Sequence, residues 1–148
     1  MAMIRIGDHA IGSGSPCFLV AEIGINHNGD LELAKKTVAA AARAGADAVK
    51  FQNFRTEDFL YDKSLTYTYK SQGRDITESQ WDMFKRYEPP PEWWPDIKGQ
   101  CDSLGIVFLS TPTSERGVDE LVQVGAQLLK NGSDYLTQTP ILEYMGST

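Results

Sequence analysis

The sequence has 148 residues with 14 basic and 20 acidic side chains, a net charge of −6. This acidic balance and the lack of a basic stripe argue against nucleic acid as the main partner, although a local pocket for a small anion is compatible with it. The longest apolar run is far too short to span a membrane or to form a signal peptide, so we expect a cytoplasmic protein without a membrane partner. Cys17 and Cys101 are expected to be reduced, half-buried thiols.

The first elements that the sequence predicts are a hairpin, a strand and a helix. Residues 4–12 alternate around the turn pair Gly7–Asp8, which is typical of a small β-hairpin. Residues 17–25 form an apolar run that predicts a strand. A helix follows, with Asp30 as its N-cap and Gly45 at its end, because apolar residues recur between them at helical spacing.

The middle of the chain combines one strand with a long polar excursion. A second strand is predicted at 46–52, and residues 53–76 then read as a loop rich in tyrosine and polar side chains. A loop of this length is functional or disordered in most domains, so we expect a mobile lid over a substrate site. Helices are predicted from about 77 to 87 and from Glu92 to just before Gly105, separated by three prolines.

The last third of the chain repeats the strand–helix order twice. A third strand at 106–111 precedes a helix capped by Thr113 or Ser114, with Val118, Leu121 and Val122 on its inner face. A fourth strand is predicted at 128–133. A final helix is predicted to begin with Thr139 as cap and Pro140 in its first turn.

Four strand–helix repeats predict an α/β fold with parallel strands and right-handed crossovers. A (β/α)8 barrel needs ~250 residues, so a chain of this length would supply about four of its eight units, preceded by the hairpin. An open sheet of the flavodoxin type is the alternative. No G-x-G-x-x-G sequence follows the first strand, so dinucleotide binding has no support.

Each predicted strand carries polar residues near its carboxyl end, where buried parallel strands are otherwise apolar. The carboxyl ends of barrel strands build active sites, so we expect these residues to form a single site. The six candidates are Glu22, Lys50, Gln52, Thr111, Lys130 and Ser133. Two lysines with hydroxyl groups and an amide would bind a phosphate or carboxylate, and Glu22 would be an ion-pair partner or a proton-transfer group.

Two other interpretations of these residues stay open from the sequence. Glu22 and Lys50 could form an ion pair that only fills the barrel, or one lysine could form a Schiff base, as in aldolases. His27 is predicted to fix a loop by hydrogen bonding rather than to bind a metal. Neither His27 nor His9 has the spacing of a metal ligand relative to a second ligand residue.

Four motifs resemble the sialic acid synthase family, the N-acetylneuraminate and related nonulosonic acid synthases. They are AEIGINHNGD at 21–30, GADAVKFQ at 45–52, FLSTP at 108–112 and KNGS at 130–133. The resemblance extends over almost the whole chain. It implies a (β/α)8 barrel that condenses phosphoenolpyruvate with an N-acetylated mannosamine-type aldose, giving a nonulosonic acid and phosphate.

The resemblance also implies roles for the six candidates. Glu22 matches a catalytic carboxylate and Gln52 a contact to the sugar. The positions that match the phosphoenolpyruvate contacts are Lys50, Thr111, Lys130 and Ser133. One departure is that Asp134-Tyr135 follows the serine where the family has Gly-Glu, and another is that Asn131 replaces an apolar residue.

The resemblance further implies a manganese or magnesium ion, held by histidines from later strands, and a C-terminal antifreeze-like domain that completes the sugar pocket of a partner subunit. We expect those parts to lie outside this chain, which would then be the first half of the barrel. The prediction is therefore a homo-oligomer that is inactive as this chain alone. The alternative is a non-catalytic half-barrel that binds an anion or serves assembly.

Overall fold

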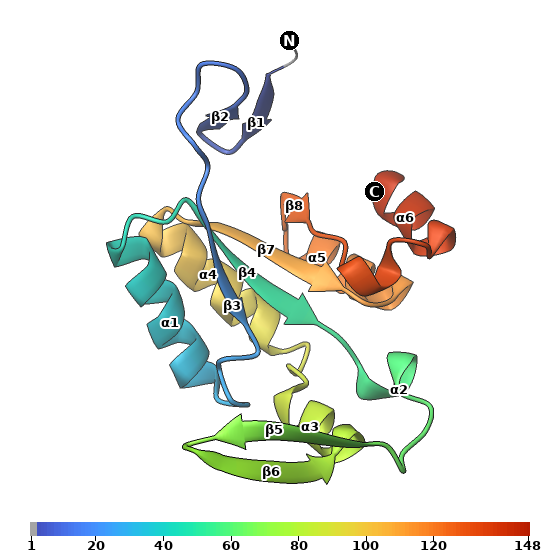
Figure 1. Cartoon of the computed structure of the whole chain (residues 1–148). Helices are drawn as coiled ribbons and strands as arrows, with labels where there is room; N and C mark the ends of the chain where they lie inside the picture. Colours follow the sequence, from blue (N-terminus) through green and yellow to red (C-terminus); the bar gives the residue numbers. More distant parts are fainter. Residues whose placement is uncertain (1–2) are drawn as a thin grey trace.

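The computed structural model describes residues 3–148. A parallel sheet in the order β3-β4-β7-β8 forms its centre (Figure 1). Its strands are β3 (Val20–Gly24), β4 (Ala48–Asn53), β7 (Val107–Pro112) and β8 (Leu128–Leu129). The α/β class and the parallel direction of all four strands were predicted correctly from the apolar runs.

The hydrophobic core lies between this sheet and helices on one of its faces. These helices are α1 (Leu31–Arg43), α4 (Trp93–Leu104) and α5 (Glu115–Gln123). Val49, Phe51 and Phe108 point from the strands into the core, and Trp94 fills it from α4. Because side chains alternate along a strand, the residues between these core positions face the opposite side of the sheet.

The helices follow the prediction at two caps and depart from it at two other residues. Asp30 accepts a hydrogen bond from Leu33 N at 3.0 Å, and Ser114 accepts one from Gly117 N at 3.3 Å. Val122 was expected on the inner face of α5, but it is 46% exposed. The last helix, α6 (Thr139–Gly146), has Gln138 as its N-cap without a side-chain hydrogen bond, so the prediction of Thr139 as cap was wrong by one residue.

The hairpin predicted at residues 4–12 is present as β1 (Ile4–Ile6) and β2 (His9–Ile11). Gly7 in its turn has a φ of 54°, a conformation that favours glycine. The hairpin lies beyond the amino ends of the sheet strands, at the opposite end of the molecule from the carboxyl ends (Figure 1).

Residues 53–76 were predicted as a loop, and this is wrong. They contain α2 (Thr56–Phe59), β5 (Thr66–Ser71) and the start of β6 (Arg74–Ser79), and β5 and β6 form an antiparallel hairpin. Gln72 and Gly73 both have positive φ, as a two-residue hairpin turn of type I′ requires. The following helix, α3 (Gln80–Tyr87), consequently begins three residues later than predicted, with Ser79 as its cap.

The fourth strand is also shorter than the predicted 128–133. Lys130 N still donates to Ser110 O at 3.1 Å, but the chain then turns into a 3₁₀ helix, η1 (Ser133–Tyr135). Gly132 O accepts from Tyr135 N in this turn, which ends the pairing with β7. Within residues 3–148, no helix has both the length and the apolar character that crossing a membrane requires.

Candidate functional site

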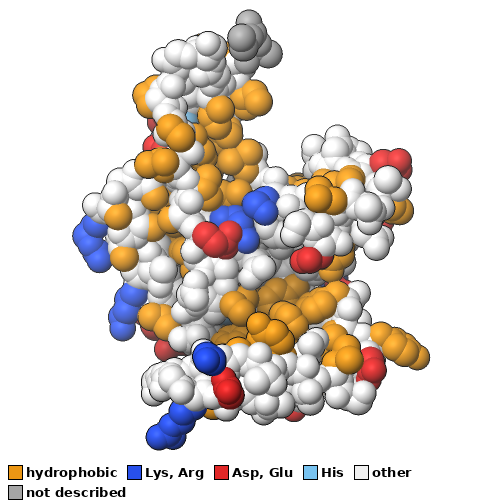
Figure 2. Space-filling model, in the orientation of Figure 1, with side chains coloured by type: hydrophobic (Ala, Val, Ile, Leu, Met, Phe, Trp, Pro, Cys, Tyr) orange, Lys and Arg blue, Asp and Glu red, His pale blue; other side chains and the backbone are white. Residues whose placement is uncertain are grey.

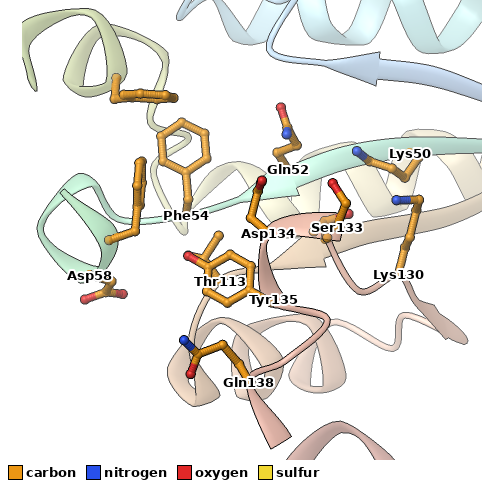
Figure 3. Close-up of a pocket in the computed structure, with 14 residues that line it drawn as sticks. Lys50, Gln52, Phe54, Asp58, Thr113, Lys130, Ser133, Asp134, Tyr135 and Gln138 are labelled. Atoms are coloured by element: carbon orange, nitrogen blue, oxygen red, sulfur yellow. The ribbon is translucent and has the colours of Figure 1, made fainter. Parts of the chain in front are cut away.

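A cavity of about 610 Å³ opens at the carboxyl ends of β4, β7 and β8. Residues from the sheet, from α2 and α3 and from the segment after β8 line it (Figure 3). The lining residues are Lys50, Gln52, Phe54, Asp58, Phe59, Phe84, Thr111, Thr113, Lys130, Gly132, Ser133, Asp134, Tyr135 and Gln138.

Five of the six residues predicted for the site line this one cavity. Lys50 and Gln52 come from β4 and Thr111 comes from the end of β7, with Gln52 and Thr111 directly paired in the sheet register. Lys130 follows β8, and Ser133 lies in η1 rather than in a strand. The predicted juxtaposition is therefore present, while the role of each residue in binding or catalysis stays a prediction.

One end of the cavity is cationic. Lys50 and Lys130 direct their amino groups into the same region (Figure 3). The Lys50 side chain is only 6% exposed and its Nζ lies 2.9 Å from Glu22 Oε1, so its burial is offset by one close carboxylate. Lys130 is exposed, and its Nζ has only a long contact of 3.4 Å, to Asn131 O. Its charge is therefore available to an anionic ligand.

Thr111 adds an unused hydrogen-bonding group beside the lysines. Its Oγ1 is buried and has no hydrogen-bond partner among the described residues. A buried hydroxyl without a partner is costly, and a ligand oxygen would remove that cost. Gly132 allows close packing here, because a Cβ at this position would lie 3.4 Å from Thr111 Cγ2.

Glu22 lies just outside this cavity. It lines a neighbouring hollow of about 570 Å³ on the open face of the sheet, and Lys50 and Lys130 line both spaces. Figure 2 shows basic side chains beside an acidic one near the middle of this face, above a hollow floored by hydrophobic side chains. Glu22 is 57% exposed, so it combines a salt bridge to Lys50 with access to solvent.

Gly24 makes room for the acidic and amide side chains of the site. The pairing of β3 with β4 shifts register between Glu22 and Gly24, and Gly24 has a φ of 56°. A Cβ at Gly24 would lie 3.2 Å from Glu22 Oε1 and 3.6 Å from Gln52 Oε1. The glycine thus permits both the bulge and the approach of these two side chains.

The far end of the cavity has an aromatic wall that the sequence analysis missed. Phe54, Phe59 and Phe84 meet edge to face, with ring centroids 4.9–5.9 Å apart. Phe54 could have been found, because it continues the alternation of Lys50 and Gln52 one residue beyond the end of β4. Phe59 in α2 and Phe84 in α3 have no such signal, since only tertiary packing brings them here.

Several polar residues between the two ends were missed as well. Thr113, Asp134, Tyr135 and Gln138 lie across the cavity from the wall (Figure 3). Burial raises the pKa of Tyr135, so its hydroxyl group keeps its proton at neutral pH. These residues supply hydrogen-bond donors and acceptors where a polyhydroxylated ligand would need them.

The end of β4 is fixed by a network behind the cavity. Asn53 Nδ2 donates to Gly117 O at 3.1 Å and to Glu120 Oε2 at 3.0 Å. Arg55 Nη2 lies 3.0 Å from Glu120 Oε1, and Glu88 Oε2 accepts from both the backbone and the hydroxyl of Thr56 at 2.9 Å. The network ties β4 to α5 and therefore holds Gln52 and Phe54 in position.

His27 fixes a loop, as predicted, and lies in the core rather than in the cavity. Its Nδ1 accepts a hydrogen bond from Gly29 N at 3.1 Å, and its ring packs against Phe51 and Trp93. Burial lowers the pKa of this imidazole, which keeps it neutral. Residues 3–148 contain no group of three or more His, Cys, Asp or Glu side chains that could hold a metal ion.

Both cysteines are free, but neither is half-buried as expected. Cys17 is exposed, whereas Cys101 is fully buried in α4, and burial raises the pKa of its thiol to about 12. A thiol with that pKa is inert at neutral pH, so Cys101 is a packing residue.

Comparisons with known proteins bear on the family and the fold of the chain. The model of the NeuB family matches residues 37–148. N,N'-diacetyllegionaminic acid synthase of Legionella pneumophila is 38% identical over 92% of this chain and 38% of its own length. Human N-acetylneuraminate-9-phosphate synthase is 31% identical over 90% of this chain and 37% of its own length.

Solved structures give the same result for the fold. The N-acetylneuraminic acid synthetase of Leptospira borgpetersenii, solved in complex with citrate, superposes with a TM-score of 0.84 at 28% identity, over 99% of this chain and 46% of that one. The chain thus spans less than half the length of the relatives that it matches. Its parallel sheet corresponds to the first four β/α units of a (β/α)8 barrel, preceded by the N-terminal hairpin.

Proposed function

The chain belongs to the NeuB family, and on this premise we propose that its cavity serves the condensation of phosphoenolpyruvate with an N-acetylated, mannosamine-type aldose. The products are a nonulosonic acid and phosphate. The observation that carries the proposal is the convergence of Lys50, Lys130, Thr111 and Ser133 at one end of a cavity large enough for two small substrates.

Phosphoenolpyruvate would occupy the cationic end. It carries a phosphate and a carboxylate, and two lysines from different strands can meet both groups as point charges. Thr111 Oγ1 lacks a partner among the described residues and would bond a ligand oxygen, and Ser133 would add a second hydroxyl. Gln52 would contact the aldose, which has to lie beside the enol carbon.

The proposed reaction forms one carbon–carbon bond and breaks one carbon–oxygen bond. The methylene carbon of phosphoenolpyruvate attacks the aldehyde carbon, whose oxygen gains a proton. Water adds to the resulting oxocarbenium carbon and loses a proton, which leaves a hydroxyl group and the phosphate ester on one carbon. The hydroxyl group then becomes the carbonyl of the 2-oxo acid, and phosphate leaves with the bridging oxygen and the hydroxyl proton. We assign the proton transfers of this reaction to Glu22, because its carboxylate lies 2.9 Å from Lys50 Nζ and is open to solvent.

The divalent metal ion implied by the family does not fit the residues that the structure describes, because residues 3–148 bring no three ligand side chains together. No role for a metal is therefore assigned to them. We propose that this chain alone binds phosphoenolpyruvate without turning it over.

Two rivals deserve a direct test. A lysine that forms a Schiff base would make the site aldolase-like, and a non-catalytic anion-binding module would keep Lys50 and Glu22 only as a structural pair. The second rival has a specific observation in its favour, since Lys50 Nζ has a carboxylate partner of its own, Glu22 Oε1, at 2.9 Å.

A ³¹P NMR titration tests whether the cavity binds phosphoenolpyruvate and whether phosphate is released, and borohydride trapping tests the aldolase-like rival. We expect the phosphoenolpyruvate signal to shift or broaden with protein, and no free phosphate to appear when an N-acetylmannosamine-type aldose is added. An unchanged phosphoenolpyruvate signal would reject the proposed function. Release of phosphate together with a 2-oxo acid would confirm the reaction and reject the expected inactivity of this chain, and a pyruvyl–lysine adduct trapped by borohydride would establish the aldolase-like rival.

A further inference from the structure

The outer edge of the β5–β6 hairpin is an unpaired strand with the features of an interaction surface. We propose that β6 pairs antiparallel with β6 of a second copy of this chain, so that two hairpins join into one four-stranded sheet about a two-fold axis. No residue of β5 or β6 lines the cavity at the carboxyl ends of the central sheet. The inference is therefore independent of the proposed function.

The hairpin is regular although most of its surface is exposed. Its strands pair over six residues each without a register shift, from Thr66 with Ser79 to Ser71 with Arg74. Five residues of β5 and the first four of β6 are exposed. A two-stranded hairpin alone is marginally stable in water, and a third strand or a packed face normally completes it. A further strand at one edge would thus stabilise this hairpin.

The free edge of β6 offers backbone groups to such a strand. β6 forms the side of the hairpin that lies away from the central sheet, and no strand within residues 3–148 pairs with its outer edge (Figure 1). The hydroxyl oxygens of Thr68 and Thr77 lie 2.8 Å apart, a close approach typical of a non-hydrogen-bonded antiparallel pair. Because the two kinds of pair alternate, Asp75 and Thr77 direct their N–H and C=O groups away from β5.

The order of side chains along β6 favours pairing with itself. In a two-fold antiparallel pair centred on Ile76, Arg74 lies opposite the partner's Glu78, and opposite charges across a strand pair stabilise it. Asp75 lies opposite the partner's Thr77, and both have outward backbone groups to exchange. The two Ile76 side chains, each 37% exposed, meet in the centre. A register centred on Asp75 would instead oppose two carboxylates.

The charges of this pair are available for the contact. Arg74 is exposed and has no ion-pair partner among the described residues. The carboxylate of Glu78 is held in place, because it accepts hydrogen bonds from Arg86 Nη2 at 2.9 Å and from the Tyr69 hydroxyl at 2.8 Å. A carboxylate can accept about four hydrogen bonds, so Glu78 can also accept from the partner's Arg74.

The edge also lacks the features that usually prevent strand pairing. Neither β6 nor its turn contains a proline, and no bulge interrupts the strand. The contact is small, so we expect a weak dimer whose population depends on protein concentration.

Charge variants test the register. Sedimentation equilibrium in phosphate-free buffer, over about a hundredfold range of concentration, should show a monomer–dimer equilibrium for the unchanged chain. Arg74→Glu and Glu78→Arg each turn both opposite-charge pairs into like-charge pairs, and each should raise the dissociation constant about tenfold or more. An equal mixture of the two variants should associate again, because a mixed dimer has opposite charges at both positions.

A matched pair of proline variants tests the edge. Thr77→Pro removes an N–H that points to the free edge of β6, and Thr68→Pro makes the same change on the outer edge of β5. Both variants lose the same contact between the two hydroxyl groups, and neither removes a hydrogen bond between β5 and β6. We expect Thr77→Pro to abolish the dimer and Thr68→Pro to preserve it. Circular dichroism verifies that each variant is folded.

Three results would overturn the inference. The first is a monomer at every concentration of the unchanged chain. The second is a dissociation constant that stays the same in Arg74→Glu and in Thr77→Pro, which would assign the association to another surface. The third is a mixture of the two charge variants that associates no better than either variant alone.

Discussion

His27 is a buried titratable residue with a single accepting hydrogen bond. Its Nδ1 receives Gly29 N–H, and its Nε2 has no partner among the described residues. Burial holds the pKa of His27 below the ordinary value of an imidazole, about 6.5. The unfolded chain therefore binds a proton here at a higher pH than the folded chain does, and the free energy of unfolding falls as the pH drops below about 6.5.

Replacement of His27 should remove this pH dependence. In His27→Asn the amide oxygen can still accept from Gly29 N–H, and we expect a smaller loss of stability between pH ~7.5 and the lowered pKa than in the unchanged protein. Urea denaturation at a series of pH values measures the free energy of unfolding of each protein. The chain has two histidines, and His9→Asn, in the N-terminal hairpin, is the control for replacing a histidine as such. Parallel profiles for all three proteins would show that His27 does not titrate in this range.

Lys50, Gln52 and Ser133 show what the sequence can reveal at the scale of single residues. Lys50 and Gln52 were predictable because two polar residues interrupt an apolar strand on the same face. Ser133 was placed in the site but in the wrong element, because β8 already ends at Leu129 and Gly132 is the N-cap of η1. Phe59 and Phe84 could not be predicted, since their neighbourhood depends on how α2 packs on α3.

At the scale of elements, Gly29 joins the loop after β3 to the end of α3. Gly29 has a φ of 74°, and a Cβ there would lie 2.6 Å from Arg86 O, a backbone atom that cannot move without shifting the helix. Gly29→Ala should therefore lower the free energy of unfolding by more than the ~1–2 kcal/mol that the left-handed conformation alone costs.

Gly45→Ala provides the matched control for this contact. Gly45 has a similar φ of 84°, but a Cβ there would meet no atom within 4 Å. We expect it to show the conformational cost only, so the difference between the two urea midpoints isolates the contact with α3. Equal losses in the two variants would mean that the loop and α3 separate easily.

The β5–β6 hairpin explains the largest error of the sequence analysis at this scale. Its strands TYTYKS and RDITES alternate β-branched, aromatic and charged residues around the pair Gln72-Gly73, which is a hairpin signal. The segment is mostly exposed and polar, and the lack of an apolar face led to the prediction of a loop. Its role as a mobile lid over the substrate site stays a prediction.

At the scale of the whole molecule, the order of strands and helices was predictable because parallel strands covered by helices leave long apolar runs. Each of β3, β4 and β7 has such a run, and Asp30 and Ser114 mark where α1 and α5 begin. The observed ends of the helices and strands differed from the predicted ends by one to four residues, at helix caps and at strand ends.

The outer edges of β3 and β8 have no strand partner among residues 3–148. Unpaired edges beside an open face invite association, and a two-fold dimer that pairs edges would bring four lysines together. The expectation is therefore an oligomer favoured by phosphate, which light scattering at low and high phosphate can check. A monomer at 16.4 kDa under both conditions would contradict it.

The central claim, that Lys50 and Lys130 bind phosphoenolpyruvate by charge, has one direct measurement. Calorimetric titration of phosphoenolpyruvate into Lys50→Gln and Lys130→Gln should show losses of roughly 1.5–3 kcal/mol each, about 10- to 150-fold in Kd. Lys36→Gln is the control, because it removes the same charge from an exposed position on α1, whose helix covers the other face of the sheet. Binding that is equal in all three variants and in the unchanged chain would contradict the account.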